Sequence, residues 1–119
     1  MIDSAVAAAV HDHVRAFNDR DVDALIGGFT EDACWITGST TVRGRAELTE
    51  LFSGAMSGLL PTLVVRSLLA DADRAACQLV ETLTVDGEEV ICSIAGFYEF
   101  RDGRIASAKI YREGSADVG

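Results

Sequence analysis

The sequence predicts an α+β fold, with helices near the start of the chain packed on a curved antiparallel sheet formed by the remainder. The early part repeats apolar residues every three or four positions, which is typical of helices with one buried face. The later part alternates apolar and polar residues over runs of strand length. Asp-Gly pairs at 86–87 and 102–103 separate these runs, and this dipeptide favours tight hairpin turns. Helices followed by a hairpin-connected sheet form an α+β arrangement.

Three helices are expected in the first half of the chain. Val10 and Phe17 belong to the apolar stripe of the first helix, which ends at Asn18. Asp21 is a natural N-cap for a short second helix at 22–28, because its side chain accepts hydrogen bonds from otherwise unpaired backbone amides. A third helix is expected at about 46–56.

The strands are expected where β-branched and aromatic residues gather. Residues 30–32 are expected to form a turn before the first strand, and residues 38–41 a loop after it. Residues 1–113 are expected to form a single domain, and 114–119 a C-terminal tail. The expected strands are 33–37, 63–69, 76–85, 88–100 and 104–112.

The composition excludes several classes of function. The chain has 119 residues and a net charge of −9, and such an acidic surface repels nucleic-acid backbones. No apolar run approaches the ~18 residues of a membrane span, and no basic stretch precedes the first apolar segment. We therefore expect a cytoplasmic protein that binds neither nucleic acid nor membrane. The three widely spaced cysteines indicate neither a disulfide framework nor a zinc site. Without a glycine-rich phosphate loop or an HExxH motif, no cofactor and no metal is expected.

Two polar residues interrupt faces that are otherwise apolar. His13 lies on the stripe of the first helix, either as a core histidine bonded to a backbone carbonyl or as an acid–base group in a pocket. Glu81 alternates with Leu79 and Leu83, and burying a carboxylate is costly unless it is paired or its pKa rises. The alternative is that this face is the outer one, with Glu81 in water or at a dimer contact. We predict His13 and Glu81 as catalytic residues, with coupled titrations if they meet.

Four further residues are candidates for substrate binding. Trp35 and Thr37 share one strand face, where Trp35 is either a flat wall for a ligand or part of the core. Tyr98 either donates its phenolic hydrogen to a ligand or packs in the core with its hydroxyl satisfied. Arg112 either binds a carboxylate, pairs with Glu81, or is an exposed residue at the end of a strand.

Three motifs, in order, span nearly the whole chain. An aromatic-Asn-x-x-Asp junction at 17–21 precedes a Phe-x-x-Asp-Ala turn at 29–33. A Gly-Arg pair at 44–45 leads into the third helix. The run at 96–105 reads Gly-Phe-Tyr-Glu-Phe-x-x-Gly-Arg-Ile. In these features the chain resembles the SnoaL-like branch of the nuclear transport factor 2-like superfamily.

The resemblance implies a cone, in which a curved sheet wraps around three helices and an internal pocket opens at one end. The superfamily includes polyketide cyclases, ketosteroid isomerase, limonene epoxide hydrolase, dehydratases and binding modules, so the fold does not determine the function. Set beside ketosteroid isomerase, the position of its catalytic base falls on Thr37, and those of its oxyanion-hole residues fall on Gly96 and His13. Because none of its catalytic side chains is kept, the mechanism of that enzyme is not expected here.

The sequence thus favours a cofactor-independent acid–base enzyme, of the isomerase, cyclase, dehydratase or hydrolase type, acting on a small apolar oxygenated molecule. The alternative is a non-catalytic module for small-molecule binding or dimerisation. A cavity shared by His13 and Glu81, within reach of a hydrogen bond or one water, would favour the enzyme. A homodimer is expected through the outer sheet face, because helices cover only one face. The apolar residues expected on that outer face are Val80, Ile91, Phe97, Ile105 and Tyr111.

Overall fold

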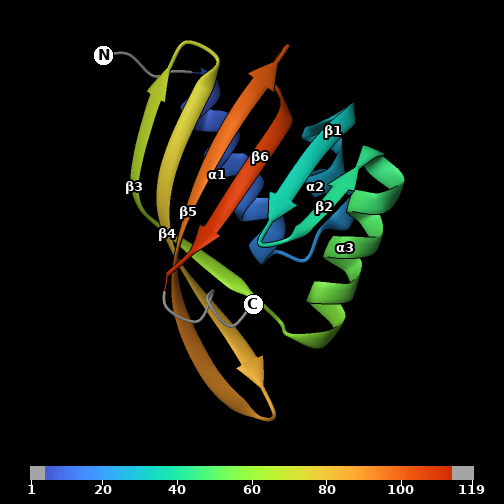
Figure 1. Ribbon diagram of the computed structural model, residues 1–119, viewed down its shortest axis with the longest axis vertical. Helices are drawn as coiled ribbons and strands as arrows, with labels where there is room; N and C mark the ends of the chain where they lie inside the picture. Colours follow the sequence, from blue (N-terminus) through green and yellow to red (C-terminus); the bar gives the residue numbers. More distant parts are fainter. Residues whose placement is uncertain (1–4, 114–119) are drawn as a thin grey trace.

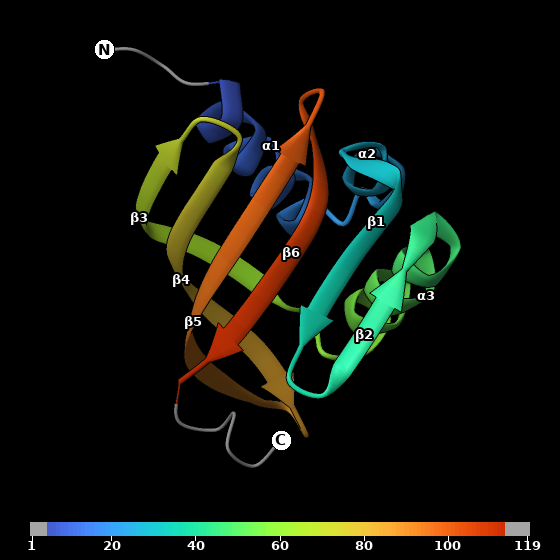
Figure 2. The same ribbon diagram turned by 45° about the horizontal axis from the view of Figure 1, so that its top comes forward.

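Three helices cover one face of a six-stranded sheet in the computed structural model of the chain, which describes residues 5–113 (Figure 1). Helix α1 packs on β3 and β4, and α3 packs on β1 and β2, so both lie behind the sheet in Figure 2. The predicted α+β class is confirmed, whereas the expected tail at 114–119 lies outside the described residues. The elements are α1 (Ala5–Asn18), α2 (Val22–Gly27), β1 (Phe29–Thr37), β2 (Thr40–Arg43), α3 (Gly44–Gly58), β3 (Thr62–Asp71), β4 (Arg74–Val85), β5 (Glu88–Arg101) and β6 (Arg104–Arg112).

The strand order is β2-β1-β6-β5-β4-β3, and the sheet is mixed. Strands β3 to β6 form the expected antiparallel meander, and β2 is antiparallel to β1. Strand β1 runs parallel to β6, so one pair departs from the expected antiparallel sheet. A long connection through α3 and four strands separates the two, so no hairpin dictates their relative direction.

The first strand is longer than predicted, and the loop that follows it is shorter. Residues 30–32, expected to form a turn, belong to β1, and the register between β1 and β6 shifts between Phe29 and Cys34. Only Gly38 and Ser39 form the turn, because Thr40–Arg43 continues as β2. Gly38 supplies the positive φ, of 58°, that this turn requires.

The longest strands, β4 and β5, bend away from the rest of the sheet toward their shared turn (Figure 1). Both predicted Asp-Gly turns are present, with positive φ at Asp86, Gly87, Asp102 and Gly103. Positive φ at two successive central residues is the geometry of a tight hairpin turn whose twist matches that of its strands. The bend leaves the inner face of β4 and β5 concave toward the helices.

The inner face carries the core and the outer face does not. Side chains on β4 and β5 alternate between buried and exposed over most of their length, as the two-residue period predicts. The buried polar side chains among residues 5–113 are His13, Thr30 and Glu81, so Glu81 faces inward, not outward. None of the helices in this described range is both long and apolar enough to cross a membrane.

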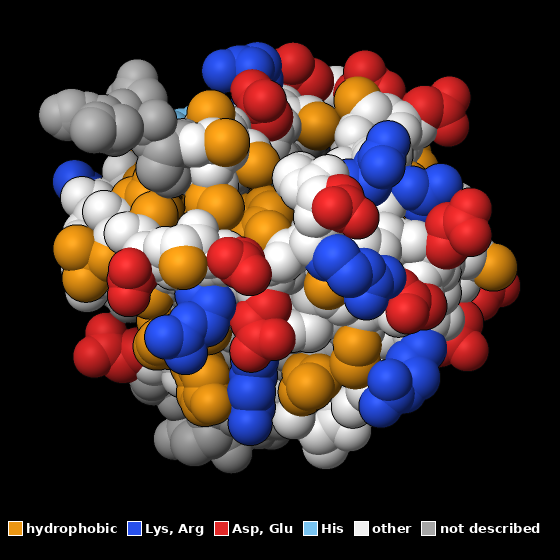
Figure 3. All heavy atoms as spheres, turned by 90° about the horizontal axis from the view of Figure 1, so that it is seen from above, with side chains coloured by type: hydrophobic (Ala, Val, Ile, Leu, Met, Phe, Trp, Pro, Cys, Tyr) orange, Lys and Arg blue, Asp and Glu red, His pale blue; other side chains and the backbone are white. Residues whose placement is uncertain are grey.

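The outer face exposes large apolar side chains, as expected, although two of the predicted residues are not among them. Ile91, Phe97 and Tyr111 are exposed. Val80 is half-buried, and Ile105 is buried with 1% of its surface exposed. The prediction for Ile105 was wrong because a register shift between β5 and β6 at Glu99 and Phe100 changes the face to which it points. Elsewhere on the surface, apolar side chains lie between acidic and basic ones (Figure 3).

Candidate functional site

A cavity of about 130 Å³ lies between the inner sheet face and the helices, and its walls are largely apolar. Helices α1 and α3 contribute Phe17, Leu51 and Phe52 to its lining, and the segment before β3 contributes Pro61. All residues predicted as catalytic or substrate-binding border this one cavity: His13, Trp35, Thr37, Glu81, Tyr98 and Arg112.

His13 enters the cavity wall from α1, whose apolar stripe directs it toward the sheet. Its imidazole is surrounded by the rings of Phe29, Trp35 and Tyr98, with centroid separations of 5.7, 5.9 and 5.8 Å. Neither ring nitrogen has a hydrogen-bond partner, so the predicted backbone-bonded core histidine is not what the structure contains. Burial lowers the pKa of His13 from 6.5 to about 4. The imidazole is therefore neutral near pH 7 and offers one donor and one acceptor.

Glu81 and Arg112 form an ion pair in the same wall. Glu81 lies on the inner face of β4, and only 7% of its side chain is exposed. Its carboxylate accepts a hydrogen bond from Nη1 of Arg112 at the end of β6, and this bond raises the pKa of Arg112. The arginine is therefore not a solvated strand end, although 31% of its side chain still reaches water. The negative charge at Glu81 is balanced by Arg112 and not by His13, which makes no hydrogen bond.

Tyr98 reaches back across the neighbouring glycine on its own strand. A Cβ on Gly96 would lie 2.7 Å from the Tyr98 hydroxyl oxygen, so the ring occupies the space that any other residue would fill. The hydroxyl donates to the thiol of Cys77, which pairs with Gly96 across β4 and β5. Burial raises the pKa of Tyr98 well above its usual range, so the phenol keeps its proton. The hydroxyl was one predicted donor to a ligand, and here it is occupied by Cys77.

Trp35 and Thr37 lie on the inner face of β1, at the side of the cavity near α3. Trp35 is buried, and its ring centroid lies 5.1 Å from that of Phe52. Thr37 is half-buried at the end of the strand. The ring of Trp35 therefore belongs to the aromatic core, as one alternative predicted, and it also borders the cavity, while its contact with a ligand stays a prediction.

Sequence reasoning missed two residues that shape the cavity. Phe52 on α3 borders it, and only its helical periodicity marked it as buried. Asn18, interpreted only as a helix end, donates from Nδ2 to the Leu63 carbonyl at 2.9 Å and accepts from the Leu63 amide at 2.8 Å. This pair of bonds holds the start of β3 against α1. An asparagine at a helix end gives no signal in the sequence for so distant a partner.

The wall can exchange or hold a proton without a metal. Among residues 5–113, no group of three His, Cys, Asp or Glu side chains is placed to bind a metal ion. What the cavity offers is a neutral imidazole and a carboxylate held by a guanidinium, both behind apolar walls. In such surroundings, hydrogen bonds and charges act more strongly than in water.

Comparison with known proteins shows that solved structures share the fold that surrounds this cavity. No curated protein matches the chain by sequence. Among solved structures, an NTF2-like protein of unknown function from Burkholderia pseudomallei has a TM-score of 0.88 at 16% identity, covering 98% of this chain and 95% of that one. SalBIII, an epoxide hydrolase/cyclase-like enzyme in pyran ring formation in the polyether salinomycin, has a TM-score of 0.86 at 23% identity, covering 93% of this chain and 92% of that one. An LEH-like epoxide hydrolase from M. tuberculosis has a TM-score of 0.84 at 19% identity, covering 92% of this chain and 83% of that one.

These structural likenesses show the fold, which this chain shares with the NTF2-like protein from Burkholderia pseudomallei. The family is shown by sequence, because the model of the SnoaL-like domain matches residues 10–108. The matched range includes all the residues that line the cavity except Ile110 and Arg112 at the end of β6. The chain belongs to the SnoaL-like domain family.

Proposed function

We propose that the protein is a cofactor-independent acid–base enzyme acting on a small, mostly apolar, oxygenated molecule. The observation that carries the proposal is the joint placement of an unpaired neutral His13 and the Glu81–Arg112 pair in the wall of one apolar cavity. A buried polar group without a partner costs about 1–3 kcal/mol. A ligand oxygen or hydroxyl that bonded to His13 would recover much of that free energy.

The roles follow from the charge states. The Glu81 carboxylate is the proton acceptor. Arg112 holds this carboxylate in place and stabilises negative charge that develops on the substrate beside it. His13, as a neutral imidazole, donates a hydrogen bond to a substrate oxygen that gains negative charge. Isomerisation, cyclisation, dehydration and water addition all need such a base and donor. Proton transfer by a positioned side chain supplies roughly 10²–10⁴-fold in rate.

The test is proton exchange, which requires no knowledge of the natural substrate. The protein would be incubated with cyclohexanone in D₂O, and loss of the α-hydrogens followed by NMR. We expect exchange above the buffer rate, and about 10²-fold less for Glu81→Gln. His11→Phe, an exposed change on the same helix, is the matched control and should leave exchange unchanged. Equal exchange by wild type, Glu81→Gln and buffer would refute the proposed chemistry.

A second candidate function is ligand binding without catalysis. It is favoured by the contacts already made in the cavity, where Glu81 is bonded to Arg112 and the Tyr98 hydroxyl to Cys77. A module of this kind would bind cyclohexanone through His13 and would exchange no protons. Binding lost in His13→Phe, with exchange at the buffer rate in every protein, would identify it.

We also propose that the protein forms a homodimer through the outer sheet face. Ile91, Phe97 and Tyr111 are 67%, 53% and 49% exposed, and the last two stack edge to face at 5.8 Å. Apolar area of this kind is typical of a protein contact. Light scattering should give twice the chain mass, and Phe97→Glu should give the monomer. A monomer mass for the wild type at micromolar concentration would contradict the proposal.

We also propose that the protein is located in the cytoplasm. The cysteines at 34, 77 and 92 form no disulfide, and reduced thiols are typical of a reducing compartment. Fractionation of cells that express the protein would test the location directly.

A further inference from the structure

Resting on the proposed function, we infer that Phe52 limits the buried part of the ligand to a single six-membered ring bearing one uncharged oxygen group. The inference concerns which molecules fit the cavity, whatever reaction follows. It draws on the cavity volume, on the packing around Phe52, and on the polar groups in the wall.

The volume sets the ring count. Pockets that hold drug-sized ligands usually measure about 300–1,000 Å³. At about 130 Å³, this cavity is well below that range. It is close to an engineered apolar cavity of about 150 Å³ in another protein, which binds benzene. One six-membered ring therefore fits, and a fused second ring requires space that the wall now occupies.

Phe52 occupies that space and cannot easily move from it. It projects from α3 into the interior, where it borders the cavity and is 3% exposed. Its ring is fixed from three sides, with centroids 5.1 Å from Trp35 and 6.0 Å from both Phe17 and Phe29. Close-packed aromatic neighbours resist displacement, because a shift in one ring requires shifts in the others. The limit is therefore a property of the folded core and not of a mobile side chain.

The polar groups decide the chemistry of that ring. A neutral His13 offers one donor and one acceptor, which suits one carbonyl or hydroxyl group. A charged ligand would leave water for an apolar wall whose only close charges, on Glu81 and Arg112, already balance each other. Cyclic ketones and cyclic alcohols of one ring are therefore the ligand class that we assign.

The experiment compares one-ring and two-ring ketones on the full chain. Calorimetry would measure the dissociation constants of cyclohexanone and of decalone, its fused two-ring counterpart. Decalone is the more apolar, so a cavity without a size limit would prefer it. We expect the wild type to bind cyclohexanone at least about tenfold more tightly, which is the discrimination that a pocket achieves against an extra apolar group.

Substitution of Phe52 tests which residue sets the limit. Phe52→Leu should improve decalone binding relative to cyclohexanone by about tenfold or more, because the shorter side chain opens the wall. Phe52→Ala should go further if it folds, as circular dichroism will show. Phe100→Leu is the matched control, since Phe100 is a buried phenylalanine of β5 outside the cavity wall. It should keep the wild-type preference.

Three results would overturn the inference. They are decalone binding to the wild type as tightly as cyclohexanone, an unchanged preference in folded Phe52→Leu, and no cyclohexanone binding to the wild type at millimolar concentration. Failure of the proposed function looks different. In that case the ring-size preference persists, while neither the wild type nor any variant exchanges protons above the buffer rate.

Discussion

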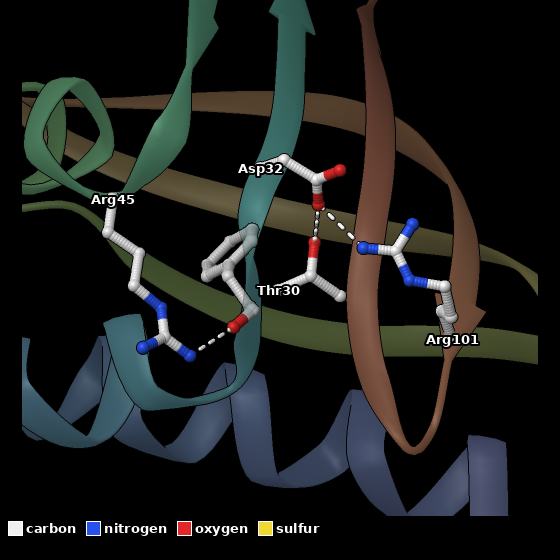
Figure 4. A network of polar contacts seen from close by, with 5 residues as sticks. Thr30, Asp32, Arg45 and Arg101 are labelled. Atoms are coloured by element: carbon white, nitrogen blue, oxygen red, sulfur yellow. Dashed lines mark hydrogen bonds and ion pairs between the residues drawn. The ribbon is translucent and has the colours of Figure 1, made fainter.

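Two sets of polar side chains in this molecule use the same chemistry under opposite conditions. One is the cavity set of His13, Glu81 and Arg112. The other, the surface network, joins Thr30 and Asp32 of β1 to Arg101 of β5, with Arg45 of α3 nearby (Figure 4). Each set contains a carboxylate bonded to an arginine, and both arginines lie at the C-terminal end of a strand.

The ion pair of the surface network is exposed to water and fully bonded, although Nε of the neighbouring Arg45 is buried without a partner. The ion pair joins Arg101 Nη2 to Asp32 Oδ1 at 2.6 Å, with side chains 56% and 72% exposed. The same oxygen accepts from the Thr30 hydroxyl at 2.9 Å, and Arg45 donates to the Phe29 carbonyl at 2.6 Å. The bond from Arg101 lowers the pKa of Asp32. Exposed pairs of this type contribute little to stability, because water and salt screen them.

The cavity set is buried, and one of its members has no partner. Such an arrangement weakens the fold unless something compensates for it. The comparison teaches that residue type does not identify a functional group. Burial without complete pairing beside a cavity marks a candidate, as at His13, because a ligand in the cavity can complete the bonds. The predictions below test this difference, beginning with the largest effect.

The largest expected effect is a loss of stability in acid caused by His13. Its pKa is about 4 in the folded protein and 6.5 in an unfolded chain, so between these pH values the unfolded chain binds a proton that the folded chain does not. Stability is therefore full above about pH 6.5 and falls as the pH drops, by about 3 kcal/mol at pH 4. Urea unfolding of wild type and His13→Phe across this range would measure the difference. Parallel pH profiles for the two proteins would show that His13 titrates normally.

Next in size is the effect of removing Arg112. Arg112→Met leaves the Glu81 carboxylate in an apolar wall without its partner. We expect a loss of about 2–3 kcal/mol, below the ~3–5 kcal/mol of a fully buried pair because part of Arg112 reaches water. Arg101→Met in the surface network is the matched control and should change the free energy of unfolding little. Equal losses in the two variants would remove the distinction between the two sets.

A smaller effect is expected from Gly96→Ala, which sharpens the account of the cavity wall. The new methyl group would meet the Tyr98 ring within 3 Å, and a buried ring has little room to retreat. We expect a loss of about 1–2 kcal/mol, in the lower part of the range for overpacked cores. Thermal or urea unfolding would measure it. In a Tyr98→Leu background the same change should be nearly neutral, and an undiminished loss there would mean that Tyr98 is not the obstacle.

The smallest effect is expected from Asp32→Asn. The side chain is largely in water, so the variant should unfold at the same urea concentration as the wild type in physiological salt. At low salt, where screening is weaker, a small loss should become measurable. A clear loss in physiological salt would show that the surface network stabilises the fold more than its exposure suggests.

Much of the fold was predictable because its signals are local. The stripe of α1 and the alternation of β4 and β5 express periods that a few neighbouring residues reveal, and the Asp-Gly turns require only two positions. The parallel pairing of β1 with β6 has no local signal, because it depends on where β1 settles against the finished meander. The burial of Ile105 depends on a bulge, which shifts the period without changing the composition.

The members of the candidate site could be predicted from the sequence, and the pairing of Arg112 with Glu81, one of the alternatives for Arg112, is confirmed. His13 and Glu81 stand out in sequence because each interrupts an apolar face, and the structure buries both. The direct contact that would couple the titrations of His13 and Glu81 is absent, since Glu81 bonds to Arg112 and His13 remains unbonded. Pairing of Tyr98 with Cys77, and the need for Gly96, follow from the direction in which one ring turns across two strands. The spacing of residues in the sequence does not predict the direction in which the Tyr98 ring turns.

The parallel pairing of β1 and β6 also bears on the order in which the molecule can assemble during synthesis. Strand β1 leaves the ribosome early, yet residue 35 has its neighbour at residue 108, near the end of the described chain. Until β6 emerges, the hairpin of β1 and β2 has no further strand to join, and Trp35 has a neighbouring strand on one side only, at Val42 of β2. The hairpin of β1 and β2 and those of β3 to β5 all form from near neighbours, so they can precede the pairing of β1 with β6. A nascent chain that stalls before β6 would therefore present the unpaired edge of β1 to the chaperones of the cell.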